Sequence, residues 1–84
     1  MKNKYLVELY VPALDQIYNL YIPANRRIGN VIVLINKALF EITNGEYKGS
    51  NTTNLFDRDS GNRFDPNQLV RESTINNGTG LIMI

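Results

Sequence analysis

The last four residues, 81–84 (LIMI), are apolar on both sides of an extended backbone. Successive side chains of a strand point to opposite faces, so a strand without a polar face is typical of the centre of a sheet, paired along both edges. Residues 76–78 (NNG) predict a tight turn directly before it. Upstream, the apolar pair at 69–70 leads through polar residues to Ile75, which we expect to be buried. The chain must therefore supply strands that flank its last segment and a helix that covers it.

Length and charge restrict the possible partners. The 84 residues suffice for one small domain, which we expect to comprise residues 1–84. Nine Lys and Arg against eight Asp and Glu give a net charge of +1, without clustering. The four cations Lys2, Lys4, Arg26 and Arg27 are too dispersed for a nucleic-acid site, so we expect no nucleic-acid partner. With no signal-length apolar run and no segment of membrane-spanning length, we expect a cytoplasmic protein without direct membrane insertion.

The N-terminal third predicts a β-hairpin. Residues 4–11 (KYLVELYV) alternate, and residues 16–22 (QIYNLYI) are rich in β-branched and aromatic side chains. The intervening residues 12–15 (PALD) are typical of a turn, and Pro23 should end the second strand. On one predicted face lie Tyr5, Val7, Leu9 and Val11, with Tyr18, Leu20 and Ile22.

A helix is predicted next, with Asn25 as its N-cap and Asn44-Gly45 as its stop signal. Its apolar stripe consists of Ile28, Val31, Ile32, Ile35, Ala38, Leu39 and Ile42. Val33 and Phe40 lie outside this stripe. Either the following loop folds over both residues, or they form a second contact surface.

The remaining residues complete the expected fold. Residues 46–54 are polar and predict a loop, residues 55–57 predict a short strand, and residues 63–64 predict a brief fifth strand. The order is then β-β-α-β-(β)-β. We predict an α+β, β-grasp fold, in which a mixed sheet of four to five strands carries one helix across one face and the last strand lies parallel beside the first.

Several spacings resemble those of ubiquitin over nearly the whole chain. The matching positions are Ile22 and Ile28, the Asn30-Val31 pair, and Val70, Ile75 and Leu81. As a short chain without cysteine, it most resembles the YukD/EsaB family, small ubiquitin-like proteins associated with type VII secretion in Gram-positive bacteria. The resemblance implies a bacterial protein-binding module, an accessory or regulatory component of a type VII-like (ESX/WXG) secretion system.

Catalysis and conjugation are not expected. Ubiquitin acts through a Gly-Gly tail, whereas this sequence ends at Ile84, and Gly78 and Gly80 precede the last strand. The chain has no His and no Cys, which removes the commonest catalytic bases and nucleophiles. We therefore expect no enzyme, no cofactor and no small-molecule substrate. Two alternatives stay open: a non-catalytic β-grasp subunit of an enzyme complex, and a carrier protein that requires processing.

A calcium loop is not expected either. Residues 57–65 (DRDSGNRFD) begin like an EF-hand loop. That pattern requires an oxygen ligand, a glycine and a glutamate where this chain has Gly61, Asn62 and Gln68. We expect a turn between two short strands and no metal.

The candidate site is the face of the sheet that the helix does not cover. If Leu81 and Met83 face the helix, the intervening and following residues face away from it. The candidate interface residues are Leu6, Tyr10, Tyr21, Phe56, Ile82 and Ile84, with Val33 and Phe40 as a secondary contact. A contiguous exposed apolar patch usually marks an interface, here with a secretion-system component or with a second copy. The alternative is that the first-strand faces are swapped, or that Glu8 and Asn19 divide the patch.

Overall fold

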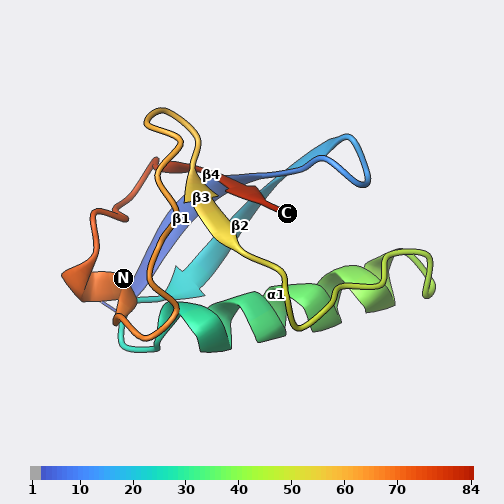
Figure 1. Cartoon of the computed structure of the whole chain (residues 1–84), viewed down its shortest axis with the longest axis horizontal. Coiled ribbons are helices and arrows are strands. Elements are labelled where there is room, and N and C mark those ends of the chain that lie inside the picture. Colours follow the sequence, from blue (N-terminus) through green and yellow to red (C-terminus); the bar gives the residue numbers. More distant parts are fainter. Residues whose placement is uncertain (1–2) are drawn as a thin grey trace.

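The computed structural model describes residues 3–84, which form a four-stranded sheet with one helix across one face (Figure 1). The elements are β1 (Lys4–Val11), β2 (Gln16–Pro23), α1 (Ile28–Ile42), β3 (Leu55–Asp57), the short 3-10 helix η1 (Val70–Glu72) and β4 (Gly80–Met83). Their order and the α+β class agree with the prediction.

The last strand lies at the centre of the sheet, as its two apolar faces predicted. The strand order is β2-β1-β4-β3. Strand β1 pairs antiparallel with β2 and parallel with β4, and β3 pairs antiparallel with β4. The sheet is therefore mixed, with β2 and β3 at its edges.

The predicted fifth strand is reduced to an isolated bridge between Phe56 and Arg63. Two backbone hydrogen bonds of 2.9 Å flank it, from the Phe64 N–H to the Leu55 carbonyl and from the Asp57 N–H to the Asn62 carbonyl. The ladder ends there because Pro66 follows closely and has no N–H to donate. The Pro66 carbonyl instead accepts the Gly29 N–H at the start of α1 (2.8 Å).

The core lies between α1 and the inner face of the sheet. Leu81 and Met83 of β4 are almost fully buried, as are Val70 and Ile75 in the segment before it. Other core residues are Val7, Leu9, Val11, Ile22, Ile28, Val31, Ile32, Ile35, Leu39, Tyr47, Leu55 and Phe64. The predicted inner faces of the hairpin and of the last strand are thus confirmed.

Two residues of the predicted helical stripe are not in the core. Ala38 and Ile42 are exposed, since the apolar stripe is wider than the surface that the sheet covers. Both side chains lie toward β2, beyond which the sheet has no further strand in the described residues. They line a groove between β2 and α1, described below.

The ends of α1 agree only partly with the prediction. The N-cap is Arg27, not Asn25, and it makes no side-chain capping bond. The loop before η1 caps the helix instead: the Ile28 N–H donates to the Gln68 carbonyl at 2.9 Å. The stop signal is confirmed, because Asn44 and Gly45 both have positive φ and the Gly45 N–H donates to the Phe40 carbonyl at 2.8 Å.

Candidate functional site

The six candidate interface residues all lie on strands or at strand ends, and their alternation places them opposite the buried positions. Leu6, Tyr21 and Ile84 are exposed, by 41%, 62% and 66% of their surfaces. Tyr10, Phe56 and Ile82 are half-buried. In β1 the buried residues are Val7, Leu9 and Val11, so the alternative with swapped faces is wrong.

The strand register brings four apolar side chains into one row across the sheet. Tyr10 of β1 lies opposite Ile17 of β2 and opposite Ile82 of β4. Ile82 in turn lies opposite Phe56 of β3. We call Ile17, Tyr10, Ile82 and Phe56 the apolar row. Ile17, exposed over 54% of its surface, was not among the predicted candidates, although its place in the alternation of β2 signals it.

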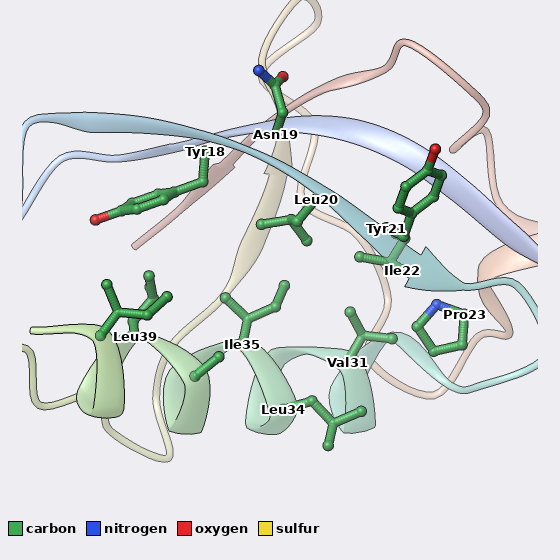
Figure 2. Close-up of a pocket in the computed structure, with 12 residues that line it drawn as sticks. Tyr18, Asn19, Leu20, Tyr21, Ile22, Pro23, Val31, Leu34, Ile35 and Leu39 are labelled. Atoms are coloured by element: carbon green, nitrogen blue, oxygen red, sulfur yellow. The ribbon is translucent and has the colours of Figure 1, made fainter.

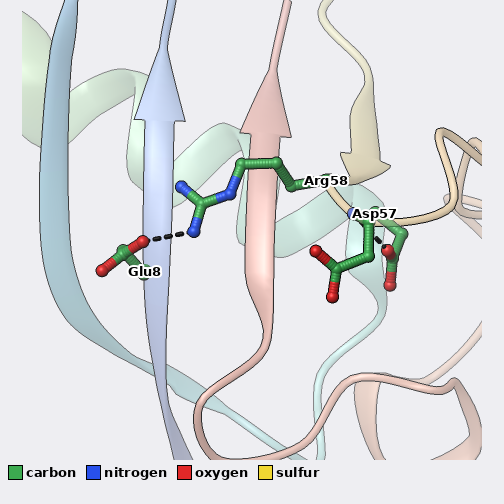
Figure 3. Close-up of polar contacts among 4 residues, drawn as sticks. Glu8, Asp57 and Arg58 are labelled. Carbon is green, nitrogen blue, oxygen red and sulfur yellow. Dashed lines mark hydrogen bonds and ion pairs between the residues drawn. The ribbon is translucent and has the colours of Figure 1, made fainter.

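A polar row runs beside the apolar row. Glu8 lies opposite Asn19 on one side and Gly80 on the other, two residues along β1 from Tyr10. Arg58, directly after β3, reaches across β4 to form an ion pair with Glu8 (Figure 3). A Cβ atom on Gly80 would lie 2.8 Å from this guanidinium, so the absence of a side chain there leaves room for the crossing.

The polar row divides the expected patch. Leu6 and Tyr21 are paired with each other on the far side of Glu8 and Asn19, away from the apolar row. The prediction of one contiguous apolar surface is therefore wrong, and the alternative of a divided patch describes the face better. The patch is divided because Arg58, which follows β3, forms an ion pair with Glu8 of β1. These two residues come together only in the folded sheet, in which β4 lies between β3 and β1.

Hydrogen bonds hold two residues in or beside the apolar row, Tyr10 and Ile84. The Tyr10 hydroxyl donates to a carboxylate oxygen of Asp15 at 3.1 Å. This hydrogen bond, and then the negative charge of Asp15, raise the pKa of Tyr10 above its ordinary value. Ile84 exchanges two backbone hydrogen bonds with Asn54 (3.0 and 2.7 Å), which hold its exposed side chain beside the row.

The secondary candidates on α1 are exposed. Val33 and Phe40 expose 65% and 49% of their surfaces, so the alternative in which the following loop buries them is wrong. The loop packs Tyr47 into the core instead, where its hydroxyl donates to the Asn36 side chain at 3.0 Å. Burial is the main cause that raises the pKa of Tyr47.

An apolar groove between β2 and α1 was not predicted. It encloses about 350 Å³, and Figure 2 shows Tyr18 above Leu39, and Ile22 above Val31, so α1 runs antiparallel to β2 along it. The lining residues are Tyr18 to Pro23 of β2 with Val31, Leu34, Ile35, Ala38, Leu39 and Ile42 of α1. Leu34 extends the apolar stripe of the helix toward β2, and this extension is the sequence feature that could have indicated the groove.

The calcium-like segment forms a turn. One carboxylate oxygen of Asp57 accepts the N–H groups of Asp59 and Ser60, each at 2.9 Å, and Gly61 has a φ of 76°. Within residues 3–84, no group of three or more His, Cys, Asp or Glu side chains is placed to hold a metal ion.

None of the dispersed cations within the described residues belongs to the apolar row or to the polar row. Lys4, Arg26 and Arg27 are exposed, and Lys2 lies outside the described residues. In the part of the chain that the structure describes, no helix is long and apolar enough to cross a membrane, since α1 has only 15 residues.

Comparisons with known proteins identify the architecture. No family model matches the chain, and no curated protein sequence matches it. Among solved structures, an N-terminal ubiquitin-like domain matches with a TM-score of 0.75 at 12% identity, over 98% of this chain and 74% of that one. The chain has the ubiquitin-like β-grasp fold.

Two other matches to this ubiquitin-like chain come from larger assemblies. The ubiquitin-like domain of the Mycobacterium tuberculosis type VII secretion system protein ECCD1 matches with a TM-score of 0.70 at 12% identity, over 96% of this chain and 97% of that one. A chain of the toluene 4-monooxygenase HD complex with an inhibitor matches with a TM-score of 0.74 at 12% identity, over 95% of both chains. At these identities the likeness concerns the fold alone.

Proposed function

We propose that this chain is a ubiquitin-like module that binds another protein through the outer face of its sheet. The observation that carries the proposal is the apolar row, which crosses all four strands on the face opposite α1. It contains two aromatic residues, Tyr10 and Phe56, and large aromatic side chains are common anchors of protein interfaces. The polar row beside it would supply hydrogen-bonding groups that fix the orientation of the partner.

The partner that we propose is a component of a type VII-like secretion system, for which the chain would be an accessory or regulatory subunit. The resemblance to the YukD/EsaB family supports this choice. The match to the ECCD1 domain, over nearly all of both chains, is compatible with it.

A second candidate is a non-catalytic subunit of an enzyme complex. It is favoured by the match to a chain of the toluene 4-monooxygenase complex, again over nearly the full length of both chains. Neighbouring genes distinguish the two candidates. A secretion ATPase and WXG-type substrates support the first, and oxygenase or biosynthetic genes support the second.

Capture of the partner from the native host tests the docking face. Phe56→Asp and Ile82→Asp place a charge in the apolar row, and Lys37→Asp changes the charge of an exposed residue of α1 outside the primary and secondary candidate contacts. We expect the wild type and Lys37→Asp to retain the same secretion component, and both row variants to lose it. Circular dichroism checks that the variants are folded. Folded row variants that retain the partner would contradict the proposal.

A further inference from the structure

The free edge of β2 exposes main-chain groups that face away from the sheet. Leu6 and Glu8 of β1 direct their main-chain groups toward the β4 side, since the Leu6 carbonyl accepts from Gly78 and the Glu8 N–H donates to Thr79. The alternate residues of β1 therefore bond to β2. By the register, Tyr18, Leu20 and Ile22 of β2 face β1, and the residues that face outward are Ile17, Asn19 and Tyr21.

This edge lacks the features that usually prevent strands of different molecules from pairing. The sequence of β2, QIYNLYIP, contains no charged residue. Its only proline is its last residue. Natural edge strands are commonly protected by charged side chains, internal prolines or bulges. From Gln16 to Ile22 the edge is thus open to another strand.

We propose that β2 pairs antiparallel with β2 of a second copy of this chain, about a two-fold axis at Asn19. The edge is self-complementary in this register. Asn19 lies opposite Asn19 of the second copy, and Ile17 opposite Tyr21, so each pair exchanges two main-chain hydrogen bonds. On the outer face this gives aromatic and β-branched cross-strand pairs, which stabilise sheets.

The apolar groove between β2 and α1 also favours a second copy of the chain at this edge. Tyr18 and Leu20 are half-buried on the inner side of β2, above the exposed helix residues Leu34 and Ile42. In the proposed register, Tyr18 lies opposite Leu20 of the second copy. The two grooves would then meet at the axis, and each would be covered by the apolar side chains of the other copy.

Charges at the two ends of the edge are complementary across this axis. Basic residues lie at the Pro23 end, where Lys4 pairs with Pro23 and Arg26 and Arg27 lead into α1. Acidic residues lie at the Gln16 end, where Asp15 precedes β2 and Glu41 lies in the last turn of α1. None of these side chains takes part in an ion pair within residues 3–84. Antiparallel pairing brings the basic end of each copy to the acidic end of the other.

Pairing would also reconnect the divided outer face. The apolar row of one copy ends at Ile17, which would lie beside Tyr21 of the other copy and, through it, beside Leu6. The apolar row would then continue across the axis. The dimer can be tested separately from the proposed docking function. Asn19, at the two-fold axis, lies outside the apolar row, so a substitution there leaves the residues of that row in place.

Light scattering of the full chain tests the association. We expect a mass of twice 9.6 kDa for the wild type as its concentration rises. Asn19→Pro removes an N–H that faces outward and spares the bonds within the sheet. Asn19→Lys places like charges opposite each other. Both should be monomeric with unchanged circular dichroism, whereas Val33→Lys should still dimerise. A wild type that stays monomeric, or a dimer unaffected in both Asn19 variants, would overturn the proposal.

Cysteine cross-linking tests the register, since the chain has no cysteine of its own. Facing residues of a hydrogen-bonded pair have Cα atoms about 5.5 Å apart, within the range of a disulfide. Asn19→Cys should therefore form a disulfide-linked dimer on mild oxidation. Ile17→Cys should not, because its counterpart lies four residues away along the strand, roughly 14 Å. Equal cross-linking of both variants would overturn the register, and with it the two-fold axis at Asn19.

Discussion

Arg58 forms its ion pair with Glu8 across an intervening strand, in the space that a side chain at Gly80 would occupy. The contact joins the end of β3 to β1, two elements that are not neighbours in the sheet. Its main consequence is for the surface, because it separates the apolar row from Leu6 and Tyr21.

The ion pair should contribute little to stability. The side chains of Arg58 and Glu8 expose 33% and 42% of their surfaces, so water and salt screen the attraction. We expect Arg58→Ala to change the free energy of unfolding by less than about 1 kcal/mol in urea denaturation. A loss above about 2 kcal/mol would mean that the contact behaves as a buried pair.

The helix stop should depend on glycine. Gly45 has a φ of 84°, where a Cβ atom is unfavourable, and we expect Gly45→Ala to cost about 1 kcal/mol. Gly80→Ala is the matched control, since Gly80 has no positive φ and its Cβ would displace only the flexible end of Arg58. Thermal unfolding should show the larger loss for Gly45→Ala, and the reverse order would contradict the conformational argument.

The two faces of β4 should respond differently to truncation. Leu81 is fully buried under α1, and Leu81→Ala should cost about 2–5 kcal/mol, because it removes apolar contacts and leaves a cavity. Ile82 is half-buried on the outer face, and Ile82→Ala should cost clearly less. Urea denaturation of both variants measures the difference. Equal costs would indicate that the outer face is covered in solution.

Tyr47 should make stability fall at high pH. Its pKa is raised in the folded chain, chiefly because burial disfavours the phenolate. In the unfolded chain the phenol titrates near 10.0, so above this pH the unfolded state loses its proton first and gains stability. This contribution is fully present below pH 10.0 and is lost as the pH rises through the folded pKa. Urea midpoints from about pH 9 to about pH 11 should fall less steeply for Tyr47→Phe.

The arrangement of strands was predictable because it depends on patterns that the residues carry locally. The two apolar faces of β4 placed it centrally, and alternation in β1 distinguished its inner from its outer residues. The polar row was not predictable in the same way. Glu8 and Arg58 are 50 residues apart, and only the register of β1, β4 and β3 brings them together.

The start of α1 was mispredicted for a related reason. Asn25 has the side chain of a good N-cap, but the N–H groups of Ile28 and Gly29 already have partners in the carbonyls of Gln68 and Pro66. These partners come from a distant loop, so no local signal indicates them. The same loop accounts for the missing fifth strand, because it leaves the sheet to cap the helix.

The most direct test of the docking function is a chemical-shift map of the isotope-labelled chain, titrated with the partner that capture identifies. We expect the largest shifts in the backbone signals of Tyr10, Ile17, Phe56 and Ile82, which the register places in one row. Shifts centred on Val33 and Phe40 of α1, with the apolar row unchanged, would contradict this expectation.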